Sequence, residues 1–194
     1  MEWAHHGIFF REELIELMCE GLGVRPGKLK ELRCTESRIL LGQFYPYCPQ
    51  PDLTAGIVPH TDHTLLTVMV QDQIGGLQVK RENKWVNVVP VEGAVTINII
   101  SNDKYKNVEH RVLANRSMES RISVPLLFHP AGVSNVDDDS SYYGPLPELL
   151  SAETPPCYKD FTLAEFWKQS QSKAICSKNL TSAFSTARDD ENLS

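Results

Sequence analysis

His60 and Asp62 are the first residues of this chain whose types and spacing are suited to binding a metal ion. They lie two positions apart, directly before the apolar run Leu65–Val70. In an extended strand, residues i and i+2 point to the same side, so the imidazole and the carboxylate can reach one ion. The same pair is also typical of a polar strand end at a protein surface. The tripeptide alone therefore leaves both interpretations open.

A third ligand is expected from His110, which lies within the β-rich run Lys106–Leu113. Pairing of neighbouring strands can bring it beside His60 and Asp62. Two histidines and one carboxylate on one face are the ligand set of non-haem Fe(II) oxygenases, which leaves coordination positions open. A lone strand histidine can instead be structural, and a zinc hydrolase would need its own general base. We favour the iron interpretation over the zinc one.

Arg121 and Ser123 form a second pair at positions i and i+2, eleven residues after His110. A guanidinium and a hydroxyl on one strand face can bind a carboxylate, with the arginine in a bidentate contact. Tyr45 ends an earlier strand-like run, and its phenol can hydrogen-bond a bound acid or serve as a packed aromatic residue. Gln43 shares its face. These residues are suited to binding an organic acid, but an Arg-x-Ser pair is also expected by chance in a chain of this composition, so the pair alone leaves both interpretations open.

The composition excludes several classes of protein. The 194 residues carry 19 Lys and Arg against 25 Asp and Glu, a formal net charge of −6. Such a chain lacks the charge for broad phosphate contacts, so nucleic acid is not an expected partner. No apolar run approaches the roughly 18 residues of a membrane span, so no membrane partner is expected. Five scattered cysteines without a C-x-x-C pair, and the lack of a signal sequence, predict a reducing, cytoplasmic location.

The elements that must position these residues fall into three zones. Residues 1–38 are expected to be the remnant of a helical region, with helices over residues 9–22 and up to Arg33. Residues 39–130 are expected to form a β-rich core. Residues 131–194 are expected to form a loop and a helix, with a partly disordered tail.

Short β-rich runs separated by turn residues predict the strands of the core. The expected strands are Ile39–Tyr45, Leu65–Gln71, Gly76–Lys80, Trp85–Val89, Ala94–Ile100, Lys106–Leu113 and Ile122–His129. Close spacing without helices between them predicts a sandwich or barrel such as a jelly roll.

A capping box marks the start of the expected C-terminal helix. Thr162 and Glu165 have the spacing in which each side chain caps the other's backbone, and Phe161 and Phe166 occupy the positions of a hydrophobic staple. This pattern predicts a helix that begins at Leu163.

Five ordered motifs carry a family resemblance. They are Tyr45–Pro51, Pro59–Asp62, Gln71–Val79, Ser101–Lys106 together with His110–Val112, and Arg121–Ser123. Their order resembles that of the plant 2-oxoglutarate- and Fe(II)-dependent dioxygenases. More narrowly, it is similar to the homologues of 1-aminocyclopropane-1-carboxylate oxidase. The resemblance extends over about residues 39–168, because Tyr143–Leu146 and Tyr158–Phe161 are also similar to the family.

The resemblance implies a mainly β fold with flanking helices, around a double-stranded β-helix, which is a jelly roll of the cupin type. It implies that Fe(II) and 2-oxoglutarate are the cofactor and the co-substrate. The residues that it assigns are His60, Asp62 and His110 as metal ligands, and Arg121, Ser123 and Tyr45 as contacts of the distal carboxylate of 2-oxoglutarate. It implies no catalytic side chains beyond the metal ligands.

The expected function is oxidation of a small molecule of plant secondary metabolism. In the family, O₂ and 2-oxoglutarate are consumed, succinate is released, and the organic substrate is hydroxylated or desaturated. One alternative is an oxidase that uses ascorbate in place of 2-oxoglutarate, as 1-aminocyclopropane-1-carboxylate oxidase does. The other is a jelly roll without catalysis that only binds a ligand or partner.

The chain is shorter than the family pattern at two places. Relatives carry a substantial helical region ahead of residue 9, and a Gly-Asp turn with a short apolar stretch between Ile99 and Ile100. A change of register at this junction would turn His110 to the opposite face of its strand. We therefore expect this chain to bind iron weakly and to turn over little, compared with a chain that has both segments.

Overall fold

The computed structural model describes residues 2–33, 35–62, 64–89, 101–105, 108–130, 142–162, 164–166, 168 and 184–186. Its elements are α1 (Glu2–Leu22), α2 (Lys28–Glu31), β1 (Ser37–Leu40), β2 (Gln43–Tyr45), η1 (Pro51–Leu53), β3 (Ala55–His60), β4 (Leu66–Gln71), β5 (Leu77–Arg81), β6 (Lys84–Asn87), β7 (His110–Leu113), β8 (Arg121–His129), β9 (Tyr142–Tyr143), η2 (Pro147–Leu149) and β10 (Phe161–Thr162).

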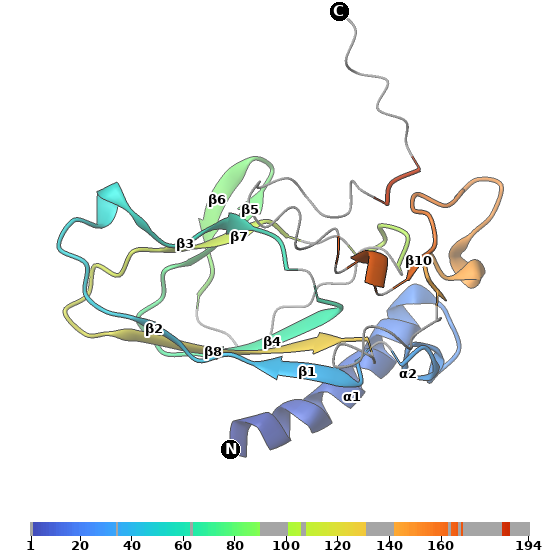
Figure 1. Ribbon diagram of the computed structural model, residues 1–194, viewed down its shortest axis with the longest axis horizontal. Helices are drawn as coiled ribbons and strands as arrows, with labels where there is room; N and C mark the ends of the chain where they lie inside the picture. Colours follow the sequence, from blue (N-terminus) through green and yellow to red (C-terminus); the bar gives the residue numbers. More distant parts are fainter. Residues whose placement is uncertain are drawn as a thin grey trace, which may run out of the picture.

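Two antiparallel sheets face each other and form the jelly-roll core (Figure 1). In one sheet the long strand β8 is central, with β1 and β2 in succession along one edge and β4 along the other. The second sheet has the order β3-β7-β5-β6. The predicted fold class is therefore confirmed.

Several strands differ from the sequence-based prediction. The predicted strand Ile39–Tyr45 is two strands, because the chain leaves the strand conformation at Leu41 and Gly42 before pairing with β8 again. Strand β3 was not among the predicted strands, since Gly and Pro within it weaken the strand pattern. The predicted strand Ala94–Ile100 lies outside the described residues. The other predicted strands correspond to β4, β5, β6, β7 and β8.

The helical predictions are confirmed where the structure describes them. Helix α1 contains the predicted helix over residues 9–22 and begins earlier, at Glu2, and α2 is the second short helix. Residues 164–166 are helical, and the predicted start at Leu163 lies outside the described residues. Their capping box forms, because the Thr162 backbone N–H donates to Glu165 Oε2 at 2.8 Å and the Glu165 N–H donates to Thr162 Oγ1 at 3.2 Å. Residues 131–141 and most of the predicted tail lie outside the described residues.

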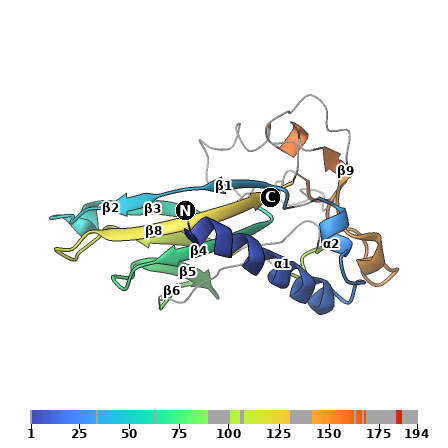
Figure 2. The same cartoon turned by 90° about the horizontal axis from the view of Figure 1, so that it is seen from below.

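Helix α1 covers the outer face of the sheet that contains β8 (Figures 1 and 2). Leu14 of this helix packs against a buried cluster made of Leu66, Val68, Leu126 and Phe128. The helix therefore braces the two strands that pair most extensively, β4 and β8, from outside. Among the described residues, no helix combines the length and the apolar character that a membrane span requires.

Candidate metal centre

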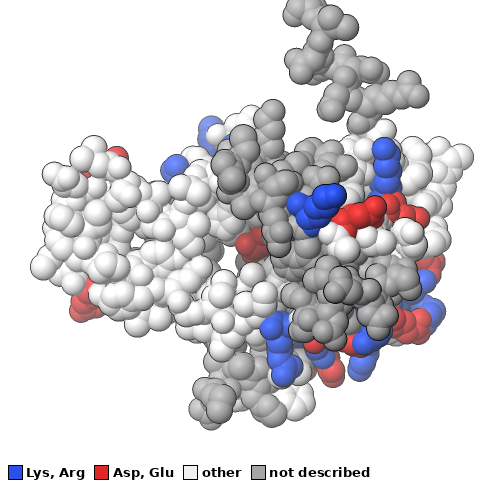
Figure 3. All heavy atoms as spheres, viewed as in Figure 1, with Lys and Arg blue, Asp and Glu red and all other residues white. Residues whose placement is uncertain are grey.

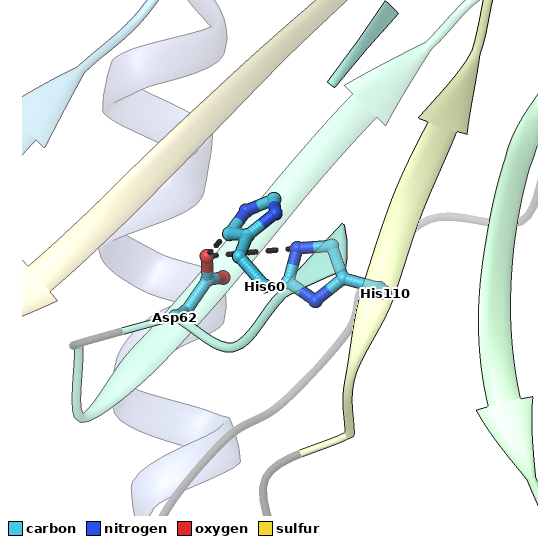
Figure 4. Close-up of side chains that lie close together, drawn as sticks. All are labelled: His60, Asp62 and His110. Atoms are coloured by element: carbon cyan, nitrogen blue, oxygen red, sulfur yellow. Dashed lines mark ion pairs between the residues drawn. The ribbon is translucent and has the colours of Figure 1, made fainter. Parts of the chain in front are cut away.

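The end of β3 and the start of β7 bring two histidines together. His60 is the last residue of β3, His110 is the first of β7, and the two are register partners. Asp62 Oδ1 lies 3.7 Å from His60 Nε2 and 3.6 Å from His110 Nε2. Figure 4 shows the carboxylate facing both rings. The three side chains each offer a ligand atom, and these atoms lie within 4.8 Å of one another.

Backbone carbonyl groups fix how both rings are turned. His60 Nδ1 lies 2.8 Å from the carbonyl oxygen of Val58, and His110 Nδ1 lies 3.1 Å from that of Val108. A carbonyl oxygen only accepts hydrogen bonds, so in the neutral ring Nδ1 carries the proton and Nε2 keeps its lone pair. Histidines that bind metals are commonly oriented in this way. The cluster therefore presents two nitrogen donors and one oxygen donor to a single ion.

The cluster has room for ligands that the protein does not supply. The side chains of His60, Asp62 and His110 keep 36%, 18% and 21% of their surface exposed. Within the described part of the chain, no fourth His, Cys, Asp or Glu belongs to the cluster. A closed structural zinc site has four protein ligands, whereas two histidines and one carboxylate suit a mononuclear Fe(II) site with open positions. The donor set fits the expected iron.

The metal cluster faces the space between the two sheets. His110 and Val112 lie two positions apart on β7 and therefore share a face of the strand. Val112 packs in an apolar cluster with Leu77 of its own sheet and Tyr45 of the opposite sheet. His110 is thus on the inner face, although the junction expected to alter its register lies outside the described residues.

A buried arginine begins β8 in the opposite sheet. Arg121 is 1% exposed and Ser123 is also 1% exposed, and the Arg121 Nη1 donates to Ser123 Oγ at 3.1 Å. The Nη2 donates to Gln71 Oε1 at 2.8 Å. The guanidinium carbon lies 4.8 Å from the centre of the Tyr45 ring, a cation–π contact. We call Arg121, Ser123, Tyr45 and Gln71 the arginine cradle.

The arginine cradle has the properties of a carboxylate site. No carboxylate forms a salt bridge with Arg121 among the residues that the structure describes. Its Nε is buried and has no hydrogen-bond partner there. A buried cation is costly without a counter-charge, and a carboxylate binds a guanidinium with two hydrogen bonds. The residues present therefore fit a bound carboxylic acid such as 2-oxoglutarate.

The predicted site residues on β2 lie where the sequence places them. The Tyr45 hydroxyl donates to Gln43 Oε1 at 3.0 Å, and the Ser123 hydroxyl donates to the same oxygen at 2.8 Å. Gln43 pairs with Ser123, and Tyr45 with Arg121, in the strand register. The i, i+2 spacing thus correctly predicted that Gln43 and Tyr45 share a face of their strand, which lies beside Arg121 and Ser123.

Gln71 is a member of the arginine cradle that the sequence analysis did not assign. Its strand β4 alternates between the two faces of the sheet, and Gln71 pairs directly with Ser123. A polar amide at the end of an otherwise apolar strand was the available signal. Its significance depends on the pairing of β4 with β8, which the sequence does not reveal.

Comparison with known proteins agrees with this geometry. Residues 36–130 match the 2OG-Fe(II) oxygenase superfamily. The chain is 45% identical over 181 residues to 1-aminocyclopropane-1-carboxylate oxidase homolog 5 of Arabidopsis thaliana. The aligned region covers 90% of this chain and 44% of that protein. It is 48% identical over 159 residues to deacetoxyvindoline 4-hydroxylase of Catharanthus roseus, and this alignment covers 79% of the chain and 39% of that protein. The chain thus spans less than half the length of these two relatives.

A solved structure extends the comparison to the fold. The crystal structure of JOX2 in complex with 2OG, Fe and JA superposes with a TM-score of 0.81 at 25% identity. The match covers 96% of this chain and 55% of that chain. The cofactor and co-substrate expected from the sequence, Fe(II) and 2-oxoglutarate, are those of this family. Residues 36–130 of this chain are accordingly a 2OG-Fe(II) oxygenase domain, with relatives among plant oxygenases.

Proposed function

We propose that this chain acts as an Fe(II)- and 2-oxoglutarate-dependent oxygenase. His60, Asp62 and His110 would hold the iron, and Arg121, Ser123 and Tyr45 would bind the distal carboxylate of 2-oxoglutarate. The observation that supports this best is the placement of a three-ligand cluster on one sheet and a buried arginine without a carboxylate partner on the facing sheet. An iron site alone would not require the buried cation.

Each residue has a definite task in this function. Bound Fe(II) supplies activation of O₂, so that O₂, 2-oxoglutarate and a substrate R–H yield succinate, CO₂ and R–OH. The carbonyl groups of Val58 and Val108 keep the protons of the histidine rings on Nδ1, which leaves both Nε2 atoms free to bind metal. Arg121 neutralises and orients the co-substrate, because its fork matches a carboxylate.

We infer that the organic substrate is a small plant metabolite, which is hydroxylated or desaturated. The relative named deacetoxyvindoline 4-hydroxylase supports this inference, because its name describes hydroxylation of one such metabolite. The arginine cradle favours 2-oxoglutarate over ascorbate as co-substrate, since a buried guanidinium is the usual partner of a carboxylate.

We also infer a cytoplasmic protein whose partners are small molecules, O₂ included, and neither nucleic acid nor membrane. The formal net charge is −6. Figure 3 shows Lys and Arg interspersed with Asp and Glu over the end of the molecule that carries α1 and α2. Ion pairs such as Lys28 with Glu148 and Arg33 with Glu36 lie in this region. A mixed surface of this kind offers no extended field for a polyanion.

The test is succinate formation by the purified chain with Fe(II), 2-oxoglutarate and O₂. We expect succinate to form above a control without Fe(II), and Asp62→Ala to abolish it. Turnover that requires ascorbate and releases no succinate would indicate the ascorbate-dependent alternative. A chain that binds no iron after anaerobic reconstitution would indicate a jelly roll without catalysis.

A further inference from the structure

Gln71, the last residue of β4, has only one half of its side-chain amide in a hydrogen bond. Its Oε1 accepts from Arg121 Nη2 at 2.8 Å. Its Nε2 is buried and has no hydrogen-bond partner in the described part of the chain. Arginine only donates hydrogen bonds, so the carbonyl half of the amide must face Arg121 and the NH₂ half must face away.

Strand pairing places this amide on the inner face of the sheet. Gln71 is the register partner of Ser123, which shares its face with Arg121. The next residue, Asp72, points the other way, and its carboxylate accepts hydrogen bonds from the backbone N–H groups of Ile74 and Ile122. Strand alternation thus puts a neutral amide into the arginine cradle and keeps the neighbouring carboxylate out of it.

Two buried donors in the arginine cradle therefore need an acceptor, Gln71 Nε2 and Arg121 Nε. A buried donor without an acceptor is costly in free energy. A carboxylate supplies two acceptor oxygens and the counter-charge for the guanidinium. We propose that Gln71 is a further binding residue for the distal carboxylate of 2-oxoglutarate, an inference that rests on the proposed function.

The neutrality of Gln71 is as important as its N–H group. A glutamate has nearly the same shape as glutamine. At residue 71 its carboxylate would form an ion pair with Arg121, at the 2.8 Å that now separates Gln71 Oε1 from Arg121 Nη2. The positive charge of the cradle would then be neutralised from within. A bound carboxylate would lose its ion pair and meet a like charge. Glutamine holds the guanidinium in place while leaving its charge for the ligand.

The test compares two 2-oxo acids that differ in the distal carboxylate. Binding of 2-oxoglutarate and of pyruvate, which lacks this carboxylate, is measured by calorimetry without O₂, with Mn(II) in the metal site of the full chain. We expect Gln71→Glu to raise the Kd of 2-oxoglutarate at least about thirtyfold. The Kd values of pyruvate and of Mn(II) should stay unchanged.

Gln78 on β5 provides a matched control. Its Oε1 also accepts a hydrogen bond from an arginine, Arg111 Nε, at 2.8 Å, and its Nε2 donates to Asn87. Gln78 and Arg111 lie on the opposite face of their strands from Val79 and His110, which face the other sheet. Gln78→Glu makes the same chemical change beside an arginine outside the cradle. It should bind 2-oxoglutarate as the wild type does.

A second variant, Gln71→Leu, removes both polar atoms at similar size and should raise the Kd of 2-oxoglutarate about tenfold. Thermal unfolding of each variant shows whether it folds. If Gln71→Glu does not fold, the 2-oxoglutarate affinity of Gln71→Leu tests the inference in its place. A folded Gln71 variant whose Kd for 2-oxoglutarate lies within about threefold of the wild-type value overturns this inference and leaves the proposed function standing. An equal loss in Gln78→Glu also overturns it. A wild-type chain that binds no 2-oxoglutarate in the presence of metal overturns the proposed function as well.

Discussion

The ring of Tyr45 on β2 rests against Gly56 on β3, so closely that the opposite sheet has no room for a side chain at residue 56. A Cβ atom there would lie 3.1 Å from Tyr45 Cδ1 and 2.8 Å from the carbonyl oxygen of Leu113. The same ring also contacts Arg121, whose guanidinium carbon lies 4.8 Å from the ring centre. The separation of the two sheets at Gly56 therefore sets the position of Tyr45 in the arginine cradle.

We predict that Gly56→Ala lowers the free energy of unfolding by about 1–3 kcal/mol, because the added methyl group overpacks this contact. It should also weaken 2-oxoglutarate binding, since the Tyr45 ring must move. Urea unfolding and calorimetry measure the two effects. Gly42→Ala is the control, because nothing lies within 4 Å of a Cβ at residue 42. Equal effects of the two substitutions would refute the prediction.

We predict that Arg121→Lys lowers the affinity for 2-oxoglutarate at least about tenfold and leaves metal affinity unchanged. Lysine keeps the charge but lacks the planar fork that meets a carboxylate with two hydrogen bonds. Arg111→Lys is the matched control, because Arg111 lies on the outer side of the second sheet. Its guanidinium carbon is 4.2 Å from the centre of the Trp85 ring. An unchanged affinity in Arg121→Lys would exclude Arg121 as the anchor of the co-substrate.

We predict that Tyr158→Phe lowers the free energy of unfolding by about 1–2 kcal/mol, through loss of a hydrogen bond to a charged group. The Tyr158 hydroxyl donates to Asp103, which ties the C-terminal segment to the loop that precedes β7. The control is Tyr142→Phe, because Tyr142 is 70% exposed. The prediction fails if urea unfolding shows the same stability for both variants.

The same tyrosine predicts a loss of stability at alkaline pH. Burial raises the pKa of the Tyr158 phenol, and its hydrogen bond to Asp103 and the charge of that carboxylate raise it further. Above about pH 10 the unfolded chain loses this proton while the folded chain keeps it, so the free energy of unfolding falls as pH rises. The stability difference between wild type and Tyr158→Phe should therefore narrow between about pH 9 and pH 11. A constant difference would contradict this.

Local periodicity predicted the parts of the site that lie within one strand. The two-residue spacing of Arg121 and Ser123 placed both on one face, and the structure has them in hydrogen-bond contact. The spacing of His60 and Asp62 likewise placed their ligand atoms on one side, although Asp62 lies just beyond the end of β3. In each case the geometry follows from the alternation of an extended chain.

Features that depend on pairing between distant strands could not be predicted from the sequence. Gln71 contacts Arg121 across 50 positions, and only the register of β4 against β8 brings them together. Strand β3 was missed because Gly56 and Pro59 weaken its pattern, whereas its pairing with β7 stabilises it in the structure. The set of two histidines and one carboxylate favoured iron over zinc, whereas the assignment of 2-oxoglutarate came from the resemblance of ordered motifs, since no single tripeptide specifies a co-substrate.

The most direct test of the account is the Fe(II) affinity of Asp62→Ala, measured by anaerobic titration beside wild type and Asp52→Ala. Asp52 lies in η1 and pairs with Arg116 at the surface, so it supplies the same substitution outside the cluster. We predict that wild type and Asp52→Ala bind one Fe(II) per chain, and that Asp62→Ala binds it at least about a hundredfold more weakly, because a three-ligand site has no spare donor. Wild-type affinity in Asp62→Ala would contradict the proposed metal centre.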